Sequence, residues 1–295
     1  MQVKQTTLAE AASLVCDGDT VALQNMATQA APMAMVRELI RQRRRDLGLV
    51  CLVGGIAVDW LAAAGCMDRF IGNAVSMEQF GLAQRYRRAV EDGRIRMEEL
   101  SETALLARLG AGARNLPFLP TRGMIGTDLI DINENLTMLE DPFGGPPVVA
   151  CRALVPDVAL IHCHRADRCG NVQYEPTALW PDIGIMPKAA RRVIVTTEQI
   201  VSSDVLRANP DRTVLPGFMV DAVVEVPWGA HPTSFNPLYG YDAALHLAWV
   251  AAARSDDDVA AFLESYVYGP ADHEAYLAAV GGAERTDELA RWETG

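Results

Sequence analysis

Two charged residues stand where α/β enzymes usually place their chemistry. Glu102 follows a run with apolar/polar alternation, 94–100, and directly precedes a helical segment, 104–115. Arg122 closes the proline-bounded run 116–122 behind that helix. Open α/β sheets bind ligands just beyond the carboxyl ends of their strands, which makes Glu102 and Arg122 candidate catalytic residues. A helix-capping role explains Glu102 equally well. Arg122 has a structural ion pair as its alternative, and its proline-bounded loop slightly favours the cleft.

Three further polar residues follow predicted strands. Ser76 and Glu78 come after the strand 69–74, at a position that suits a cleft or a helix cap. His231 lies in the proline-containing loop after the last predicted strand, where a histidine more often packs than catalyses. All three are candidates for substrate binding, and each has this structural alternative.

The elements that must position these residues alternate between strands and helices. This alternation predicts an α/β fold, with crossovers, an open and mostly parallel sheet, and flanking helices. Residues 128–149 are expected to form a long excursion with short strands, and about 242–295 a helical C-terminal cap. No repeat or flexible linker divides the chain, so 1–295 is expected as one domain. The predicted strands are 20–23, 47–53, 69–74, 94–100, 158–162, 193–196 and 220–226, and the predicted helices are 6–17, 33–42, 58–64, 82–92, 104–115, 243–253, 256–266, 273–280 and 283–292.

The bulk composition argues against several partners. The chain has 295 residues and a formal net charge of −12. Nucleic acids and anionic membranes need a basic surface, so neither is expected as a partner. No apolar run is long enough to span a bilayer, and the six scattered cysteines suit reduced thiols, so a cytoplasmic protein is expected.

Common catalytic signatures are missing from the sequence. It has no Walker loop, no GxGxxG turn after a strand and no GxSxG elbow. The histidines, cysteines and carboxylates show no usual metal-ligand spacing, so no metal is expected. An ordinary nucleotide-dependent enzyme, serine hydrolase or metalloenzyme is therefore disfavoured.

Short motifs occur in a characteristic order over most of the chain. They are 31–42 (APMAMVRELIRQ), 58–61 (VDWL), 64–66 (AGC), 87–93 (RRAVEDG), 111–122 (AGARNLPFLPTR), 126–128 (GTD), 165–167 (RAD), 170–171 (GN), 229–234 (GAHPTS) and 239–242 (YGYD). Together they resemble the α subunit of two-subunit class I coenzyme A transferases, of the glutaconate CoA-transferase type. The resemblance runs from about residue 6 to about residue 268.

The resemblance implies a mechanism and a division of labour. In this family a glutamate carboxylate attacks the acyl-CoA thioester to give a mixed anhydride, which the released CoA thiolate converts to a glutamyl-CoA thioester. The CoA then passes to a second carboxylate. In two-subunit relatives that glutamate belongs to the β subunit, so an α subunit such as this one shapes the acyl and CoA cleft. The implied partners are a β subunit in an α2β2 or larger assembly, an acyl-CoA and a carboxylate; coenzyme A thioester is substrate, with no permanently bound cofactor.

The loop after the first predicted strand departs from the family. Relatives often carry glycines there, so that backbone N–H groups face the thioester oxygen. Here the loop 24–28 reads QNMAT, without glycine. The side chains of Gln24 and Asn25 are therefore candidates to donate hydrogen bonds to the substrate instead.

A second interpretation uses Glu102 and Arg122 directly. A divergent member of the same fold resembles this chain as well: a ring-opening hydrolase of steroid catabolism that acts on a CoA thioester. There an acidic residue of the α subunit serves as base, with an arginine nearby, and Glu102 and Arg122 fall at the matching positions. Hydrolysis, ring opening or decarboxylation is thus the alternative to CoA transfer, and a scaffold that only stabilises its partner is a third.

Overall fold

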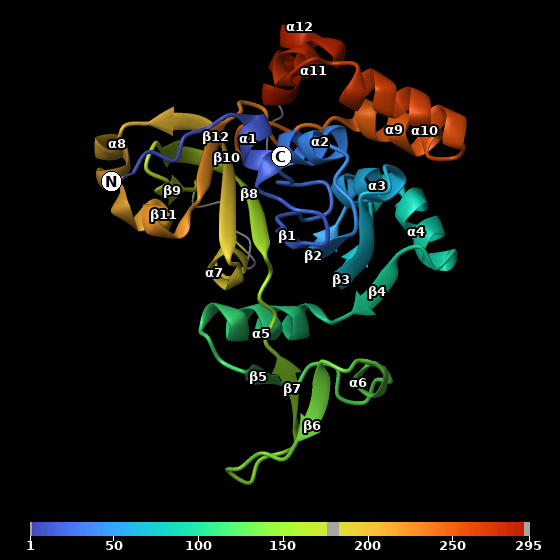
Figure 1. Cartoon of the computed structure of the whole chain (residues 1–295), viewed down its shortest axis with the longest axis vertical. Helices are drawn as coiled ribbons and strands as arrows, with labels where there is room; N and C mark the ends of the chain where they lie inside the picture. Colours follow the sequence, from blue (N-terminus) through green and yellow to red (C-terminus); the bar gives the residue numbers. More distant parts are fainter. Residues whose placement is uncertain (1, 176–182, 292–295) are drawn as a thin grey trace.

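The computed structural model describes residues 2–175 and 183–291. Within them a nine-stranded sheet carries helices on both faces, and a three-stranded sheet projects from it (Figure 1). The large sheet holds β1 (Thr20–Leu23), β2 (Leu47–Gly54), β3 (Met67–Val75), β4 (Arg96–Glu99), β8 (Val158–Asp167), β9 (Val172–Gln173), β10 (Arg192–Val201), β11 (Thr213–Leu215) and β12 (Ala222–Glu225), and the small one β5 (Phe118–Thr121), β6 (Leu136–Leu139) and β7 (Val148–Arg152). The helices are α1 (Leu8–Ser13), α2 (Met33–Arg41), α3 (Ile56–Ala63), α4 (Gln84–Glu91), α5 (Glu102–Ala113), α6 (Leu129–Ile132), α7 (Met186–Ala189), α8 (Ser203–Arg207), α9 (Ala243–Ala252), α10 (Asp256–Leu263), α11 (His273–Ala279) and α12 (Gly282–Ala290).

The order of the strands reverses at β1. Strands β2, β3 and β4 follow on one side of β1, and β8, β10 and β12 follow on the other, with parallel pairing throughout. The predicted open and mostly parallel sheet with flanking helices is therefore confirmed. Open α/β sheets bind ligands beyond the carboxyl ends of strands at such a switch point, here between β1 and β8.

Alternate side chains of β1 enter different cores. Val21 and Leu23 pack in the core that includes α1 to α4, α9 and α10, whereas Ala22 packs in the core that includes α5 and α7. Because both faces are covered, the central strands read as continuous apolar runs rather than alternating ones. The strand at Thr20–Leu23 has the predicted bounds for this reason.

The C-terminal helices cover the first of these faces. Trp249 of α9 and Phe262 of α10 meet Trp60 of α3 edge-on, with ring centroids 5.9 and 5.5 Å away. The Trp249 Nε1–H donates to the buried Asp59 carboxylate at 2.8 Å, and burial raises the pKa of Asp59 to about 6. These contacts hold α9 and α10 to the sheet; the predicted end of the last helix, Trp292, lies outside the described residues.

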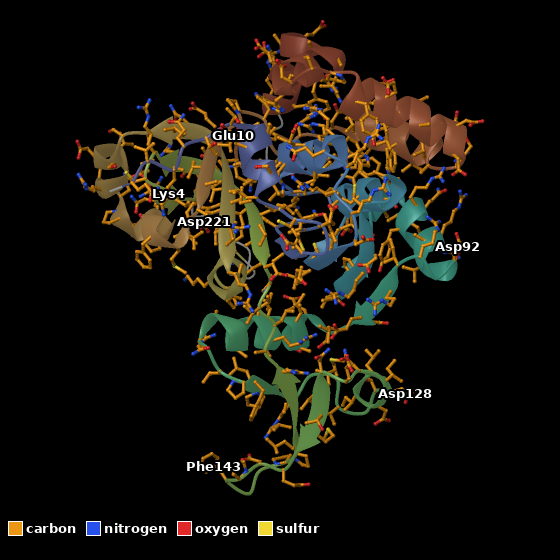
Figure 2. The ribbon with its side chains drawn as sticks, in the orientation of Figure 1. Lys4, Glu10, Asp92, Asp128, Phe143 and Asp221 are labelled. Atoms are coloured by element: carbon orange, nitrogen blue, oxygen red, sulfur yellow. The ribbon has the colours of Figure 1, made fainter. Side chains whose placement is uncertain are left out.

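The segment between β4 and β8 leaves the body of the protein and carries the small sheet. The exposed Phe143 marks the outer end of this projection, and Asp128 lies on its flank (Figure 2). The predicted excursion with short strands is confirmed by β6 and β7. The proline-bounded run 116–122 was not predicted to hold a strand, but residues 118–121 form β5; β5 is an edge strand of the small sheet, where proline is tolerated.

Strand β8 is longer than the sequence indicated. It continues past His162 to Asp167, paired with β10 on one side and with β9 on the other. The polar residues His162 and His164 are buried in it. Among the described helices, none is both long and apolar enough to cross a bilayer.

Candidate functional site

Gln24 lies at the switch point between β1 and β8, and it is buried. Its side-chain Oε1 accepts a hydrogen bond from the backbone N–H of His162 at 2.7 Å and from the Tyr174 hydroxyl at 3.3 Å. Within the part of the chain that the structure describes, its Nε2 has no hydrogen-bond partner. A buried polar group left unpaired costs about 1–3 kcal/mol, which a ligand that accepts its hydrogen bond would relieve.

Asn25 is satisfied by the protein itself. Its Nδ2 donates to the carbonyl of Ala27 at 3.0 Å, and its Oδ1 accepts from the backbone N–H of Gly55 at 2.9 Å. The two backbones are so close that a Cβ on Gly55 would lie 2.0 Å from the Ala27 carbonyl oxygen. Ala27 has φ 51°, a left-handed conformation in which residues other than glycine are uncommon. Asn25 therefore shapes the glycine-free loop, and Gln24 keeps the free amide.

Ser76 and Glu78 form a tight turn where β3 ends. The Ser76 Oγ accepts from the backbone N–H of Glu78 at 3.0 Å, and Glu78 is exposed with φ 53°. The backbone N–H of Ser76 donates to the carbonyl of Gly54 at the end of β2. Met26 in turn bridges to Val53 of β2, so the loops after β1, β2 and β3 are joined. The structure thus places Gln24, Asn25, Ser76 and Glu78 along one edge of the sheet, which we call the carboxyl edge.

A buried polar network adjoins this edge and was not predicted. The His162 Nε2–H donates to the Glu198 carboxylate at 2.7 Å, and the Tyr239 hydroxyl and the backbone N–H of Trp228 donate to it at 2.6 and 2.8 Å. Burial raises the pKa of Glu198, but these hydrogen bonds outweigh burial and lower it below the usual range. The one sequence signal is a glutamate directly after the β-branched run 193–197. The network fixes His162, whose backbone in turn holds Gln24.

His231 lies in the loop after β12, which pairs with the loop of Gln24 through Gln29 and Ser234, but its side chain contacts residues of the C-terminal part of the chain. Its Nδ1 and the Tyr276 hydroxyl are 2.8 Å apart, and its Nε2–H donates to the Asp242 carboxylate at 3.1 Å. Asp242 also caps α9 and pairs with Arg285 of α12 at 2.6 Å. Both ring nitrogens of His231 are therefore occupied by the protein, and its side chain is fully buried.

Glu102 and Arg122 lie on neighbouring segments and are both exposed. Glu102 is the first residue of α5, and Ser101 caps that helix by accepting from the backbone N–H of Ala104 at 3.2 Å. A Cβ on Gly123 would lie 2.2 Å from the Thr103 Oγ, so the loop of Arg122 touches the first turn of α5. Within the described residues, neither charged group makes a hydrogen bond or an ion pair. The two side chains remain available, and Ser101 rather than Glu102 supplies the helix cap.

The chemistry that these residues offer is donation of hydrogen bonds and charge, not metal binding. Across residues 2–175 and 183–291, no three histidine, cysteine, aspartate or glutamate side chains are grouped so that they could hold a metal ion. At the carboxyl edge, Gln24 has a buried amide nitrogen without a partner in the described chain, and Glu78 has an exposed carboxylate.

Comparison with known proteins identifies the class of enzyme. A family model described as coenzyme A transferase matches residues 5–226. The chain belongs to the coenzyme A transferase family, so the predicted family and transferase class are confirmed. It is 36% identical to the A subunit of 3-oxoadipate CoA-transferase of Pseudomonas knackmussii, over 93% of this chain and 97% of that protein.

The A subunit of glutaconate CoA-transferase is similar in both sequence and structure. The chain is 32% identical to that protein from Acidaminococcus fermentans, over 94% of this chain and 92% of the relative. The crystal structure of that enzyme superposes with a TM-score of 0.91, over 97% of this chain and 95% of the other. An uncharacterised protein of Archaeoglobus fulgidus is 37% identical over 99% of this chain, and the alignment spans 66% of its length.

Relatives with other chemistry share the fold. The cholesterol ring-cleaving hydrolase IpdA subunit of Mycobacterium tuberculosis is 28% identical over 96% of this chain and its own full length. The crystal structure of a variant of the decarboxylase AibA/AibB superposes with a TM-score of 0.79 at 34% identity, over 90% of this chain and 98% of the other. Family membership alone therefore does not fix the reaction.

Proposed function

We propose that this chain is the α subunit of an acyl-CoA:carboxylate CoA-transferase and that its carboxyl edge forms one wall of the acyl and CoA cleft. A β subunit supplies the nucleophilic glutamate, in an α2β2 or larger assembly. The support is the similarity to proteins named as A subunits of 3-oxoadipate and glutaconate CoA-transferases, over nine-tenths of their lengths or more. Acyl-CoA and a free carboxylate are the substrates, and no cofactor stays bound.

The observation that carries this proposal is the unpartnered Nε2 of Gln24. When a carboxylate attacks a thioester, the carbonyl oxygen gains negative charge, and a preorganised N–H donor stabilises that charge. Because the Oε1 of Gln24 is held by the backbone N–H of His162, only the NH2 group of the amide is free to donate. Asn25 has no such free group and acts by positioning the loop, while Ser76 and Glu78 contact the remainder of the substrate.

Replacing two buried glutamines tests this role. Gln24→Met removes the free amide, and we expect kcat for CoA transfer by the assembled enzyme to fall about 10²- to 10³-fold. Gln173→Met is the matched control, because the Gln173 Nε2 already donates to Leu206, Asn209 and Thr213. Each variant breaks buried hydrogen bonds and should lose about 1–3 kcal/mol of unfolding free energy. Equal kcat values in the two folded variants would end the proposal for Gln24.

The alternative is hydrolysis, ring opening or decarboxylation of a CoA thioester with Glu102 as base and Arg122 beside it. One observation favours it: two exposed and unpaired opposite charges on touching segments. An assay of acyl-CoA consumption without any acceptor carboxylate, with the products identified by mass spectrometry, separates transfer from these reactions. Transfer needs the acceptor, whereas hydrolysis, ring opening and decarboxylation proceed without it and should stop in Glu102→Gln while the subunits still assemble.

A further inference from the structure

A row of polar residues crosses the large sheet at the end opposite to the carboxyl edge. Thr20 of β1 pairs with Gly48 of β2, Gly48 pairs with Arg69 of β3, and Arg69 pairs with Arg96 of β4. Register partners in neighbouring parallel strands share a face of the sheet. The row lies at or near the amino ends of these strands, whereas Gln24 follows the carboxyl end of β1.

Arg69 lies flat on the sheet because Gly48 has no side chain. A Cβ at Gly48 would stand 2.6 Å from an Nη of Arg69, so the guanidinium passes directly over this glycine. One Nη of Arg69 donates to the Thr20 hydroxyl at 3.0 Å. Its Nε is buried and has no partner, and no carboxylate of the described residues pairs with it. The charge of Arg69 is thus held in place without a counter-ion.

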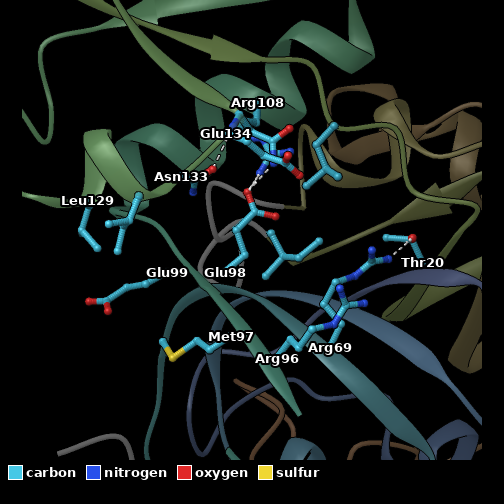
Figure 3. A pocket seen from close by; sticks show the side chains of 14 residues that line it. Thr20, Arg69, Arg96, Met97, Glu98, Glu99, Arg108, Leu129, Asn133 and Glu134 are labelled. Carbon is cyan, nitrogen blue, oxygen red and sulfur yellow. Dashed lines mark hydrogen bonds and ion pairs between the residues drawn. The ribbon is translucent and has the colours of Figure 1, made fainter. Parts of the chain in front are cut away.

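Arg96 brings a second positive charge to the same place. Both arginine side chains extend to the same side of the cavity, next to Thr20 (Figure 3). Like charges on adjacent strands destabilise a sheet unless something neutralises them. The carboxylate nearest to Arg96 is that of Asp68, at 3.9 Å, and both side chains are largely open to solvent. Arg96 therefore has one weak, exposed ion pair, and Arg69 has none within the described residues.

The arginines line one end of a cavity of about 660 Å³ between the large sheet and the projection. Apolar side chains form much of the rest of its wall, namely Ile71, Met97, Leu129, Ile132 and Leu154. The acidic residues of the wall do not neutralise the arginines. Glu98 is held by Arg108 and by Asn135, and Glu99 and Glu134 lie away from Arg69 (Figure 3).

We propose that this cavity binds an organic oxyanion with an apolar body, independently of the proposed transfer reaction. A carboxylate or phosphate group is held by Arg69, Arg96 and the Thr20 hydroxyl, and the apolar body lies against Ile71 and Leu154. Charge-assisted hydrogen bonds from guanidinium groups suit both oxyanions. A cavity of this size lies within the range of sites for small organic ligands, about 300–1,000 Å³.

Calorimetric titration of the full chain, in the assembly in which it is purified, tests this site. The probes are hexanoate, hexyl phosphate and inorganic phosphate, at constant ionic strength. We expect hexanoate or hexyl phosphate to bind to the cavity. The tighter of the two shows whether the site prefers a carboxylate or a phosphate. Inorganic phosphate should bind at least tenfold more weakly than hexyl phosphate. If neither hexanoate nor hexyl phosphate binds, the proposal is overturned. If inorganic phosphate binds as tightly as hexyl phosphate, the proposed contact between the apolar body of the ligand and the cavity wall is overturned.

Two variants and one control assign the binding to the arginines. Arg96→Gln changes an exposed side chain and cannot unfold the core, and we expect the Kd of the tighter probe to rise about tenfold or more. Gly48→Ala should do the same by displacing the Arg69 guanidinium. Arg87→Gln is the matched control, since Arg87 is exposed on α4 and pairs with Glu91. An equal Kd in Arg96→Gln and Arg87→Gln would overturn the assignment, and turnover is not needed for any of these measurements.

Discussion

The carboxyl edge and the cluster around His231 contain similar buried polar residues, yet they differ in whether their hydrogen bonds are complete. His231 and Asp242 have every polar side-chain atom engaged, by Tyr276, Arg285 and the helix that Asp242 caps. Gln24 keeps an amide nitrogen without a partner in the described chain. Fully satisfied buried networks specify a structure, whereas an orphaned group needs another explanation. Completeness of hydrogen bonding therefore separates Gln24 from the pair His231 and Asp242.

The largest effect should come from breaking the complete cluster. Asp242→Ala leaves the buried His231 and the partly buried Arg285 without their carboxylate, and we expect a loss of about 3 kcal/mol of unfolding free energy. The control is Asp257→Ala, an exposed position in the first turn of α10 with an expected change below about 0.5 kcal/mol. Urea unfolding gives both values. If Asp242→Ala folds as stably as the control but loses turnover, the cluster is not merely structural and the contrast with the carboxyl edge fails.

A second effect concerns a histidine close to the buried network. The His164 Nε2–H donates to the carbonyl of Asn236 at 2.9 Å, and its Nδ1 accepts from the backbone N–H of Glu175 at 3.2 Å, so the ring is neutral. Burial lowers the pKa of His164 to about 4. Between the unfolded pKa of about 6.5 and this value, the unfolded chain binds a proton that the folded chain does not. The contribution of the neutral His164 to the unfolding free energy is therefore fully present above pH 6.5 and is lost as the pH falls toward 4.

From pH 7 to pH 5 this one group should cost about 2 kcal/mol of unfolding free energy. Urea unfolding at both pH values measures it as the difference between the pH dependence of the wild type and that of His164→Gln. Asp257→Ala should keep the pH dependence of the wild type. If His164→Gln loses as much stability on acidification as the wild type, His164 is not the group that takes up the proton.

The sequence predicts the parts of the fold that depend on local pattern. The run Thr20–Leu23 is mostly apolar, long enough for a buried strand and too short for a helix. Its bounds were therefore predicted correctly. The turn-forming residues of 167–171 (DRCGN) predict a tight turn, and Gly170 there has φ 91°. Strand β5 was missed because Pro120 counts against a strand unless its edge position is known. The second half of β8 was missed because His162 and His164 interrupt the apolar pattern.

The carboxyl edge could be located from the sequence. Which of its polar atoms lack a hydrogen-bond partner could not be predicted. Strand ends alone indicate where Gln24 and Ser76 lie, since parallel strands bring their carboxyl ends to one edge. Which amide stays free depends on the backbone N–H of His162, a residue 138 positions away in the chain. The same holds for Glu198 and Tyr239, whose contact joins β10 to a later loop. Whether a polar side chain has all its hydrogen-bond partners depends on residues far away in the chain, and the local sequence pattern does not predict those partners.

The smallest effect tests the strained turn of the carboxyl edge against one of the same geometry elsewhere. Glu78 and Asn115 both have φ 53°, but Glu78 follows β3, whereas Asn115 follows α5. Replacing Glu78 by glycine relieves the left-handed strain, and we expect a gain of about 0.5–1 kcal/mol in unfolding free energy. Asparagine tolerates this conformation better, so Asn115→Gly should gain less.

The kinetics of the same two variants decide whether the Glu78 carboxylate is used. If it contacts substrate, as proposed, Glu78→Gly should raise the KM for acyl-CoA about tenfold while the protein becomes more stable, because a charged hydrogen bond is lost. Asn115→Gly should leave the KM unchanged. A rise in stability with no change in KM at Glu78 would mean that the turn is strained for a reason other than substrate binding. The carboxyl edge would then be reduced to the loop of Gln24.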